Sequence, residues 1–488
     1  MNKKRPIIFV SCILLVSILF FIGACEENVN SSENAEEDTK EIIIESEQET
    51  PSISESQNRE MEIIWTFNPY ESTLMDEEYI YTFGYFNGTA IVQSFDMTKG
   101  ETLWEWEDDW ENSGEIAGVD DKNLYLARDD GRIYSINKQS GGFNWKTIPS
   151  SNKNELIGQT YSDENRIYFS MIPEYGAIWD SSVFAIDKTT GDLVWELEES
   201  TLPLCWQRGW VLENILDQSS KTILLNENHH IKGVDFETGS INWFVDNFEV
   251  YTIKEGIAYG VGSLGRVGAI DIKNGDFLWL SEEYEIGDIE EISNKYIYGY
   301  LEDQKYNEYI KVIDINTGEV LCIMNLNYSY LIGEFDGLAV VSNCDLGFTW
   351  GIEAKTGKII WKNDDLVLHK KIGNYGDMLI GVNDKGFIFG IDLKTGEKKW
   401  RQSIFIMPIY TGGKIYNTSG SSFGIVLNDK IFVKTDSNNL MVLNANNGEI
   451  ITSIDTLHEI TSLRIRDNIL IVGKYGSNGG YSAIQLPQ

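Results

Sequence analysis

The chain has 488 residues and a formal net charge of −37, because 76 acidic side chains outnumber 39 basic ones. A protein this acidic repels phosphate backbones and anionic lipid headgroups, which argues against nucleic acid as a partner and against electrostatic binding to a membrane. Three of the five cysteines lie beyond Cys25, an odd number that excludes a complete disulfide framework.

The first 24 residues have the features of a bacterial signal peptide. Three basic residues at positions 3–5 precede an apolar run, 7–22, that is too short for a comfortable membrane span. The run ends in Ile-Gly-Ala-Cys, which resembles a lipobox, where cleavage precedes a cysteine that carries a diacylglycerol. An ordinary secretory signal and an uncleaved anchor are the alternatives. We expect lipidation of Cys25, and hence an extracytoplasmic protein on the bacterial cell membrane, or on the outer membrane if the source has one.

The segment after Cys25 is strongly acidic and polar. Residues 26–60 contain twelve acidic and two basic residues, with Ser, Asn and Gln filling much of the remainder. Such a stretch cannot bury enough apolar surface to offset the entropy lost on ordering. We therefore predict that residues 25–61 are a disordered tether, and that the protein contacts the membrane through its lipid only.

From residue 62 onward one phrase recurs through most of the chain. Clear copies read IDKTTGDLVW (186–195), VDFETGSINW (234–243) and IDIKNGDFLW (270–279). Nine copies align on a turn glycine, namely Gly100, Gly141, Gly191, Gly239, Gly275, Gly318, Gly357, Gly396 and Gly448. Four residues later stand Trp104, Trp145, Trp195, Trp243, Trp279, Trp361 and Trp400, with Cys322 and Thr452 in the other two copies. A repeat of about 43 residues indicates an array of one supersecondary unit.

Each copy reads as four short strands joined by turns. In residues 123–145, NLYLA and RIYSI flank an Asp-Asp-Gly turn, and the turn glycine leads into a third strand. The preceding segment, GEIAGVD, supplies a fourth strand. The Asp, Glu or Asn four residues before each turn glycine can accept backbone hydrogen bonds, while glycine supplies the positive φ of a bulged hairpin. We interpret these residues as turn caps rather than metal ligands.

The tryptophan recurs together with a small residue, two positions before the turn cap. The small residues are Ser94, Ser135, Ala185, Gly233, Ala269, Gly351 and Gly390. A small residue leaves room for a large ring from a neighbouring sheet. We therefore predict that the tryptophan of one unit packs near the small residue of the next, and we favour this structural role over ligand stacking.

Radial stacking of four-stranded sheets buries both faces of each sheet, which predicts an all-β fold, a β-propeller, over residues 62–488. A linear solenoid is the alternative, but the chain ends favour closure. Residues 62–66, EIIWT, read as an isolated last strand with its own Trp65, whereas NILIVG and GGYSAIQL read as a unit that lacks one. Pairing of these N- and C-terminal strands would close the ring. The repeat count favours ten blades within a range of eight to ten, and we expect a monomer.

The repeat resembles the pyrroloquinoline quinone (PQQ)-type propeller repeat, A-x-D-x-x-T-G-x-x-x-W, over nearly all of residues 62–488. One branch of that superfamily consists of quinoprotein dehydrogenases, which bind PQQ and calcium and oxidise alcohols or sugars. Many of its alcohol dehydrogenases carry a vicinal disulfide above the cofactor, and this sequence has no Cys-Cys pair. The other branch consists of lipid-anchored propellers without cofactor, such as the scaffold lipoprotein of the outer-membrane barrel-assembly machinery. The lipobox, the tether and the bare repeat are similar to this second branch.

Three long segments interrupt the regular spacing: 171–182, 202–210 and 404–424. The first joins the second and third strands of a unit and the others connect units, so we expect all three on one face, opposite the Thr-Gly turns. They carry Tyr175, Trp179, Trp206, Arg208, Trp210, Tyr410 and Tyr416. Exposed aromatic residues beside an arginine are typical of a surface that binds protein or glycan. The alternative is that these side chains only pack the insertions onto the rim.

Other candidate sites are weak. His229 and His230 would point opposite ways on a strand and have no third ligand, and the acidic cluster at 105–111 fits a solvated connection better than a calcium site. Whether Cys205 and Cys344 pair stays open. We predict no catalytic, cofactor or metal site, and our leading hypothesis is a non-enzymatic interaction scaffold for an envelope protein or a surface glycan. A PQQ- and calcium-dependent oxidoreductase and a glycan-binding surface protein are the alternatives.

Overall fold

The computed structural model describes residues 63–486, so the predicted signal peptide, Cys25 and the tether lie outside the described residues. Within this range the residues not described are 68–71, 77, 87, 110–113, 129–130, 150–154, 174–180, 199, 203, 206–209, 212–214, 228–229, 282–287, 303–306, 326–328, 345, 384, 405–423, 436–438, 456–459, 467–468 and 475–479. The chain divides into Met1–Ser52 and Ile53–Gln488, and all described residues belong to the second unit.

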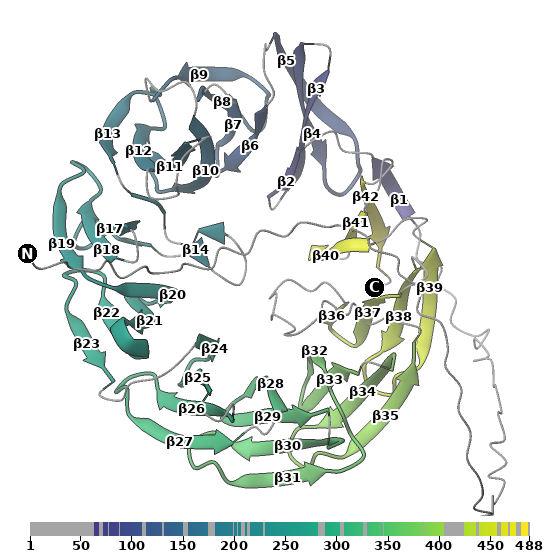
Figure 1. Ribbon diagram of the computed structural model, residues 1–488. Helices are drawn as coiled ribbons and strands as arrows, with labels where there is room; N and C mark the ends of the chain where they lie inside the picture. Colours follow the sequence, from purple (N-terminus) through teal and green to yellow (C-terminus); the bar gives the residue numbers. More distant parts are fainter. Residues whose placement is uncertain are drawn as a thin grey trace, which may run out of the picture. The chain divides into compact units, whose positions relative to one another are not determined.

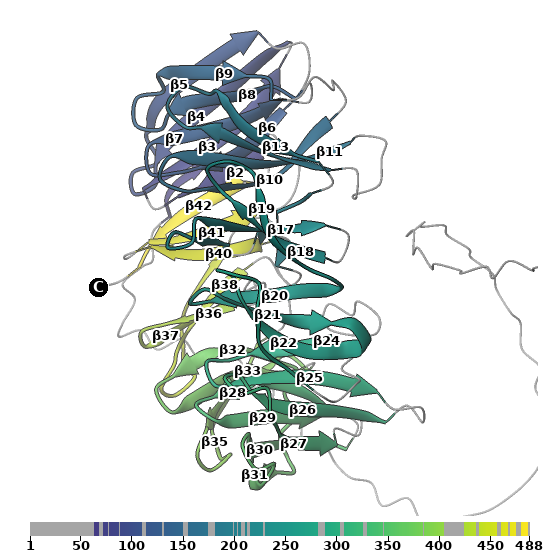
Figure 2. The same cartoon turned by 90° about the vertical axis from the view of Figure 1, so that its left-hand side faces the viewer.

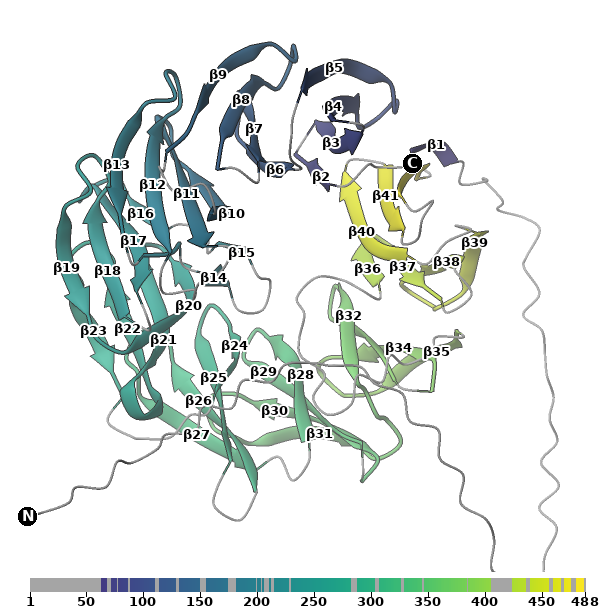
Figure 3. The ribbon, with the colours of Figure 1, turned by 45° about the horizontal axis from the view of Figure 1, so that its top comes forward.

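The second unit is an all-β propeller whose described residues form ten four-stranded sheets and one two-stranded hairpin. The sheets stand radially around a common centre, with the first strand of each innermost (Figures 1 and 3). Figure 2 shows the same ring turned by 90°. The predicted architecture is confirmed, and the blade count is ten, as the repeat count favoured.

Nine blades use four strands that are consecutive in the chain, ordered from the inside outward. Blades 1 to 3 are β2 (Ser72–Met75), β3 (Tyr79–Phe86), β4 (Thr89–Asp96), β5 (Thr102–Asp109); β6 (Gly114–Val119), β7 (Asn123–Arg128), β8 (Ile133–Asn137), β9 (Phe143–Thr147); and β10 (Glu155–Ser162), β11 (Arg166–Pro173), β12 (Ser182–Asp187), β13 (Leu193–Leu197). Blades 4 to 6 are β16 (Leu216–Asp217), β17 (Thr222–Glu227), β18 (His230–Asp235), β19 (Ile241–Val245); β20 (Phe248–Lys254), β21 (Ile257–Gly262), β22 (Arg266–Asp271), β23 (Phe277–Leu280); and β24 (Asp288–Ile292), β25 (Tyr296–Glu302), β26 (Glu308–Asp314), β27 (Val320–Asn325). Blades 7 to 9 are β28 (Ser329–Phe335), β29 (Leu338–Asn343), β30 (Phe348–Glu353), β31 (Ile359–Asn363); β32 (Lys370–Tyr375), β33 (Met378–Val382), β34 (Phe387–Asp392), β35 (Lys398–Ser403); and β36 (Gly424–Leu427), β37 (Lys430–Lys434), β38 (Asn439–Asn444), β39 (Ile450–Asp455). A short 3-10 helix, η2 (Ser263–Gly265), joins β21 to β22.

The tenth blade is made from both ends of the unit. It contains β40 (Ile460–Arg466), β41 (Ile469–Lys474) and β42 (Gly480–Gln485), and its outermost strand is β1 (Ile63–Phe67). The register pairs Trp65 with Ala483, and the hydroxyls of Thr66 and Ser482 lie 2.7 Å apart. The predicted closure of the ring by the terminal strands is therefore confirmed.

The Thr-Gly turns have the chemistry expected of their sequence. In blade 3 the Asp187 carboxylate accepts the backbone N–H groups of Thr189 and Thr190 at 2.8 and 3.0 Å. The N–H of Gly191 donates to the Asp187 carbonyl at 2.9 Å, and Gly191 has a φ of 78°, which favours glycine. The register of the same hairpin, β12 with β13, shifts between Ala185 and Ile186. These residues therefore act locally, as caps of a bulged turn.

Each repeat tryptophan lies over a small residue of its own blade. In blade 4 the register pairs Trp243 with Gly233, where an added Cβ would lie 2.0 Å from the indole. The equivalent pairs are Trp104–Ser94, Trp145–Ser135, Trp195–Ala185, Trp279–Ala269, Trp361–Gly351 and Trp400–Gly390. We expected the small residue to belong to the next unit, and this is wrong. The two positions face each other across the hairpin of the third and fourth strands.

The indole also reaches the following blade, through the turn. Trp195 Nε1 donates to the Phe236 carbonyl at 2.9 Å, and the ring lies against Gly239, where an added Cβ would come within 2.8 Å. The other tryptophans donate, at 2.8–3.1 Å, to the carbonyls of Lys138, Lys188, Ile272, Ile315, Leu393 and Ala445. In blade 6 the Cys322 thiol donates instead, to the Ala354 carbonyl at 3.2 Å. Each of these side chains thus links two successive blades.

The core lies between blades rather than within them. Buried apolar clusters fill the interfaces between neighbouring blades around the ring. At the closing interface Ile80 and Phe95 of blade 1 pack with Ile471 and Ala483 of blade 10. Burying an apolar side chain of this size stabilises a protein by roughly 1.5–3 kcal/mol. Every blade therefore depends on both neighbours for its stability.

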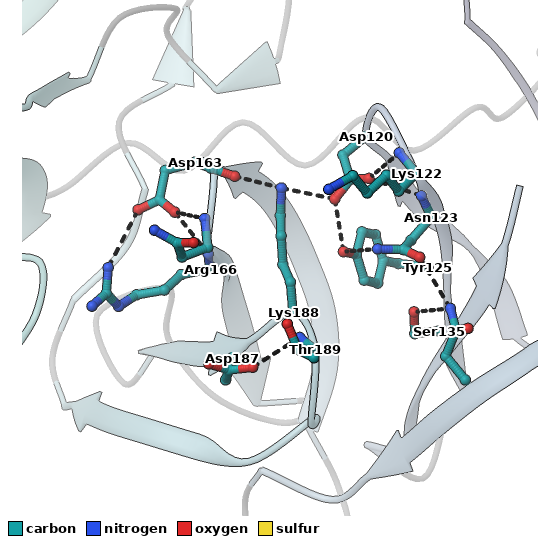
Figure 4. A network of polar contacts seen from close by, with 12 residues as sticks. Asp120, Lys122, Asn123, Tyr125, Ser135, Asp163, Arg166, Asp187, Lys188 and Thr189 are labelled. Carbon is teal, nitrogen blue, oxygen red and sulfur yellow. Dashed lines mark hydrogen bonds and ion pairs between the residues drawn. The ribbon is translucent and has the colours of Figure 1, made fainter.

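A polar network adds a further tie between blades 2 and 3 (Figure 4). The Lys188 Nζ lies 2.8 Å from Asp120 Oδ2, with the two side chains 9% and 5% exposed, and it also donates to the Asp163 carbonyl. Asp120 accepts the Tyr125 hydroxyl at 2.8 Å. Burial alone would raise the pKa of the Asp120 carboxyl, but the hydrogen bonds from Lys188, Lys122, Tyr125 and Asn123 outweigh burial and lower that pKa. An equivalent pair, Asp76 and Lys138 at 3.0 Å, joins blades 1 and 2.

Replacing Lys188 by methionine should destabilise the ring by about 3 kcal/mol at pH 7, because it leaves the buried Asp120 carboxylate without its cation. The midpoint of urea unfolding measures this loss. Because the folded pKa of Asp120 is lowered, the wild-type pair should contribute fully above about pH 4 and lose its contribution as the pH falls further.

The matched control for Lys188 is Lys221→Met. Lys221 pairs with Glu237 at 2.7 Å, but the two side chains are 53% and 44% exposed. Removing an exposed pair should change stability by less than about 0.5 kcal/mol. Equal losses in the two variants would contradict the assignment of the Lys188 pair as a buried tie.

Candidate functional site

The innermost strand of blade 4 is interrupted by an insertion. Thr201 pairs with Asn226 through two backbone hydrogen bonds of 2.9 Å, and β16 pairs with the start of β17. Between Thr201 and β16 the chain leaves the sheet and forms a hairpin of β14 (Leu204–Cys205) and β15 (Trp210–Val211). The inner strand of blade 4 is therefore interrupted in the middle by an additional segment.

The hairpin lies on the inner side of the ring (Figures 1 and 3). Strand β14 contacts β20 of blade 5, and β15 contacts β10 of blade 3, so the hairpin bridges the inner strands on either side of blade 4. Leu202 and Ile215, at the two ends of the insertion, are both fully buried. These anchors fix where the insertion leaves and rejoins the blade.

Few of the predicted contact residues lie among the described residues. Trp210 begins β15, and Trp206 and Arg208 belong to the connection between β14 and β15, at 206–209, outside the described residues. Also outside the described residues are Tyr175, Trp179, Tyr410 and Tyr416. The segment 171–182 joins β11 to β12 of blade 3, the blade against which β15 lies. That the aromatic side chains form one surface stays a prediction.

A second surface feature was not predicted. The outermost strands carry large apolar side chains on the outside of the ring, each at least 40% exposed: Ile63, Ile64, Leu103, Phe143, Leu193, Val194, Ile241, Phe244, Phe277, Leu278, Ile323, Ile359 and Ile360. We call this set the outer belt. The sequence signal was the apolar pair between the turn glycine and the tryptophan in copies such as GDLVW. Exposed apolar sheet edges are characteristic of interaction surfaces.

A pocket of about 260 Å³ lies between blades 7 and 8. It is lined by Cys344, Asp365, Val367, His369, Asn383, Lys385, Phe387, Phe389, Lys398 and Arg401. The Cys344 Sγ lies 3.1 Å from His369 Nε2 and 2.6 Å from the Tyr330 hydroxyl oxygen. The Arg401 guanidinium lies 4.6 Å from the centre of the Phe387 ring. The sequence pointed to Cys344 only as a possible disulfide partner. Its spatial neighbours come from other parts of the chain, so they could not be recognised from the sequence.

The remaining sequence candidates are placed as follows. His230 lies on β18 with its Nδ1 3.1 Å from an Asp246 carboxylate oxygen and its ring stacked on Phe244. Among the described residues no group of three His, Cys, Asp or Glu side chains converges as a metal site. Cys344 is a thiol in blade 7, whereas Cys205 lies on β14 beside blade 5. No helix in the described part of the chain is long and apolar enough to cross a membrane.

Comparison with known proteins agrees with this architecture. The family model described as outer membrane protein assembly factor BamB matches residues 88–324 and 306–469. No curated protein matches the chain significantly.

Similar solved structures include BamB from Moraxella catarrhalis, at 15% identity over 87% of this chain and 100% of that chain, with a TM-score of 0.37. The computationally designed protein Ika8 is 13% identical over 77% of this chain and 98% of its own, with a TM-score of 0.39. A quinohemoprotein alcohol dehydrogenase from Comamonas testosteroni is 13% identical over 88% and 78%, with a TM-score of 0.38. At this identity and these scores, the three structures say nothing about function.

Proposed function

Because the chain belongs to the family of the outer membrane protein assembly factor BamB, we propose that it is a non-enzymatic interaction scaffold, held by a lipid at Cys25 on the extracytoplasmic side of a bacterial membrane. The partner is another envelope protein. A role in barrel assembly is not part of the proposal, because no motif of this sequence is specific to it.

The observation that carries the proposal is the insertion in blade 4. A propeller needs its inner strands to stack neighbouring blades, yet in this blade a hairpin along the inner side of the ring interrupts the inner strand between Thr201 and β16. In sequence, Trp206 and Arg208 fall between β14 and β15, at positions 206–209 outside the described residues. Aromatic and arginine side chains close together in the sequence of an inserted hairpin are suited to a protein contact.

The proposed lipid anchor is compatible with the position of β1. This strand is the outermost strand of blade 10, so the described part of the chain begins on the outer side of the ring, after the predicted tether at 25–61. A flexible chain of this length spans roughly 30 Å, and repulsion between its acidic residues extends it. We propose that this segment acts as a spacer between the lipid and the propeller.

Replacing Trp179 and Trp206 together by alanine should reduce partner capture at least about tenfold, because each aromatic anchor of an interface contributes about 2 kcal/mol or more. The measurement is crosslinking in native cells, followed by affinity capture and quantitative identification of the partner. The matched control is Phe143→Ala with Ile148→Ala, two residues of blade 2 that are 52% and 56% exposed. Unchanged capture by the tryptophan variant would contradict the proposed surface, and loss in the control alone would place the contact on the rim.

Two assays separate the scaffold from the alternative functions. Dye-linked oxidation of alcohols or sugars after addition of PQQ and calcium would overturn the proposal. Binding on a glycan array, together with unchanged protein capture by the tryptophan variant, would favour the glycan-binding alternative.

A further inference from the structure

The pocket between blades 7 and 8 holds a cysteine and a histidine in fixed positions. Cys344 follows β29 in a turn where the Asn343 side chain accepts the Leu346 N–H at 2.7 Å and Gly347 adopts a φ of 78°. His369 precedes β32, and its N–H donates to the Val382 carbonyl at 2.8 Å. The capped turn around Cys344 and the backbone hydrogen bond of His369 thus position the two residues, and their side chains are half-buried at the pocket wall.

The geometry of the pair suits proton transfer. A separation of 3.1 Å between Sγ and Nε2 is within the reach of a hydrogen bond to sulfur. An imidazole at this distance can take the thiol proton and stabilise the thiolate, which is the nucleophilic form of cysteine. The Tyr330 hydroxyl also contacts the sulfur and can donate to that thiolate. The pair therefore has the arrangement of an activated thiol.

The charge of the pocket is opposite to that of the protein. Among the described residues Lys385, Lys398 and Arg401 line it, against one lining carboxylate, Asp365. Lys398 donates to the backbone carbonyl of Asp365 at 3.1 Å, which keeps its ammonium at the pocket. In a chain with a net charge of −37 such a group of cations is a local exception. It favours entry of small anions over small cations.

We propose that Cys344 is a reactive thiol, activated by His369, that undergoes exchange with small anionic disulfides admitted to this cationic pocket. The site is independent of the scaffold role. In the first step the thiol proton passes to His369 Nε2, and the thiolate attacks one sulfur of the organic disulfide. The sulfur–sulfur bond of the ligand breaks, one half stays on Cys344 as a mixed disulfide, and the other leaves as a thiolate that takes the proton from His369.

Cys322 provides an internal comparison in the same chain. Its thiol donates to the Ala354 carbonyl at 3.2 Å in the interface between blades 6 and 7, and burial raises its pKa. A thiol of this kind reacts slowly, because little of it is ionised and its surroundings are apolar. The two cysteines should therefore differ strongly in rate under identical conditions.

The test uses the full chain and glutathione disulfide, with peptide mapping by mass spectrometry to follow each cysteine separately. Mixed disulfide should form at Cys344 at least about tenfold faster than at Cys322, and His369→Asn should slow the reaction at Cys344 about tenfold. Cationic cystamine serves as a matched probe. Lys385→Gln with Arg401→Gln should slow the reaction with glutathione disulfide but not with cystamine, and added salt should reduce the preference for the anionic probe.

Three results would overturn the proposal. Equal rates at Cys344 and Cys322 would show that the thiol is not activated. An unchanged rate in His369→Asn, in a variant whose urea unfolding midpoint matches the wild type, would remove the role of the imidazole. Equal rates with the two probes at low salt would remove the selection for anions.

Discussion

Deleting residues 63–67 should prevent the ring from closing and lower its stability by about 5 kcal/mol. The five-residue strand β1 is the only outer strand that blade 10 has among the described residues, and each backbone hydrogen bond that it makes to β42 contributes about 1 kcal/mol. The deletion also exposes the edge of β42. Urea unfolding and limited proteolysis of blade 10 measure the effect.

The deletion has a control of equal length and a rescue. Removing residues 41–45, which lie in the predicted tether, should leave the unfolding midpoint unchanged. Moving β1 to the C-terminus, behind a Thr-Gly turn after β42, should restore the stability, because the other blades already connect their third and fourth strands in this way. An unfolding midpoint unaffected by the deletion would contradict closure by β1.

Replacing Gly390 by valine should destabilise the protein by about 3 kcal/mol, because there is no room for a side chain beneath the indole. A Cβ at Gly390 would lie 2.3 Å from the Trp400 ring and 2.7 Å from the Met378 sulfur. Displacing the ring also strains its hydrogen bond to the Ala445 carbonyl, at 3.1 Å, in blade 9. Urea unfolding measures the loss, and tryptophan fluorescence reports the displacement.

The chain itself suggests the rescue. In blade 6 the tryptophan position is Cys322 and its register partner is Val312, and in blade 9 the pair is Thr452 and Val442. A smaller residue on the outer strand thus accompanies a larger one on the third strand. Gly390→Val with Trp400→Cys should therefore lose less stability than the sum of the two single changes. Strict additivity would contradict the direct packing of the pair.

The fold followed from sequence because the repeat exposes its own boundaries. The turn caps and glycines mark one hairpin in every unit, and the isolated EIIWT at 62–66 indicated a ring that closes through its termini. The partner of the tryptophan was harder to predict. Spacing along the chain fixes which residue types recur together, but register decides whether they meet inside one blade or between two. Here Trp400 meets Gly390 in one blade and Gly448 in the next.

The sites were less predictable than the fold. The spacing marked 202–210 as irregular but suggested a connection between units, whereas the segment lies within the inner strand of blade 4, which stops pairing after Thr201 and resumes at β16. The thiol pocket depends on packing between two blades, which brings together Cys344 and His369 from turns 25 positions apart. Neither residue belongs to the repeat, so periodicity could not relate them. The outer belt was visible in the repeat but needed the radial arrangement to show which side faces outward.

Closure by β1 also means that the ring can close only at the end of synthesis. The chain is synthesised from its N-terminus, so β1, the strand that closes the ring, is made before any complete blade. Its pairing partner β42 is made last. Until translation ends, the ring is open between blade 1 and blade 10. A product truncated before residue 480 lacks β42 and cannot close the ring. Complete and truncated molecules therefore differ in whether β1 is paired with β42, which is decided only at the end of synthesis.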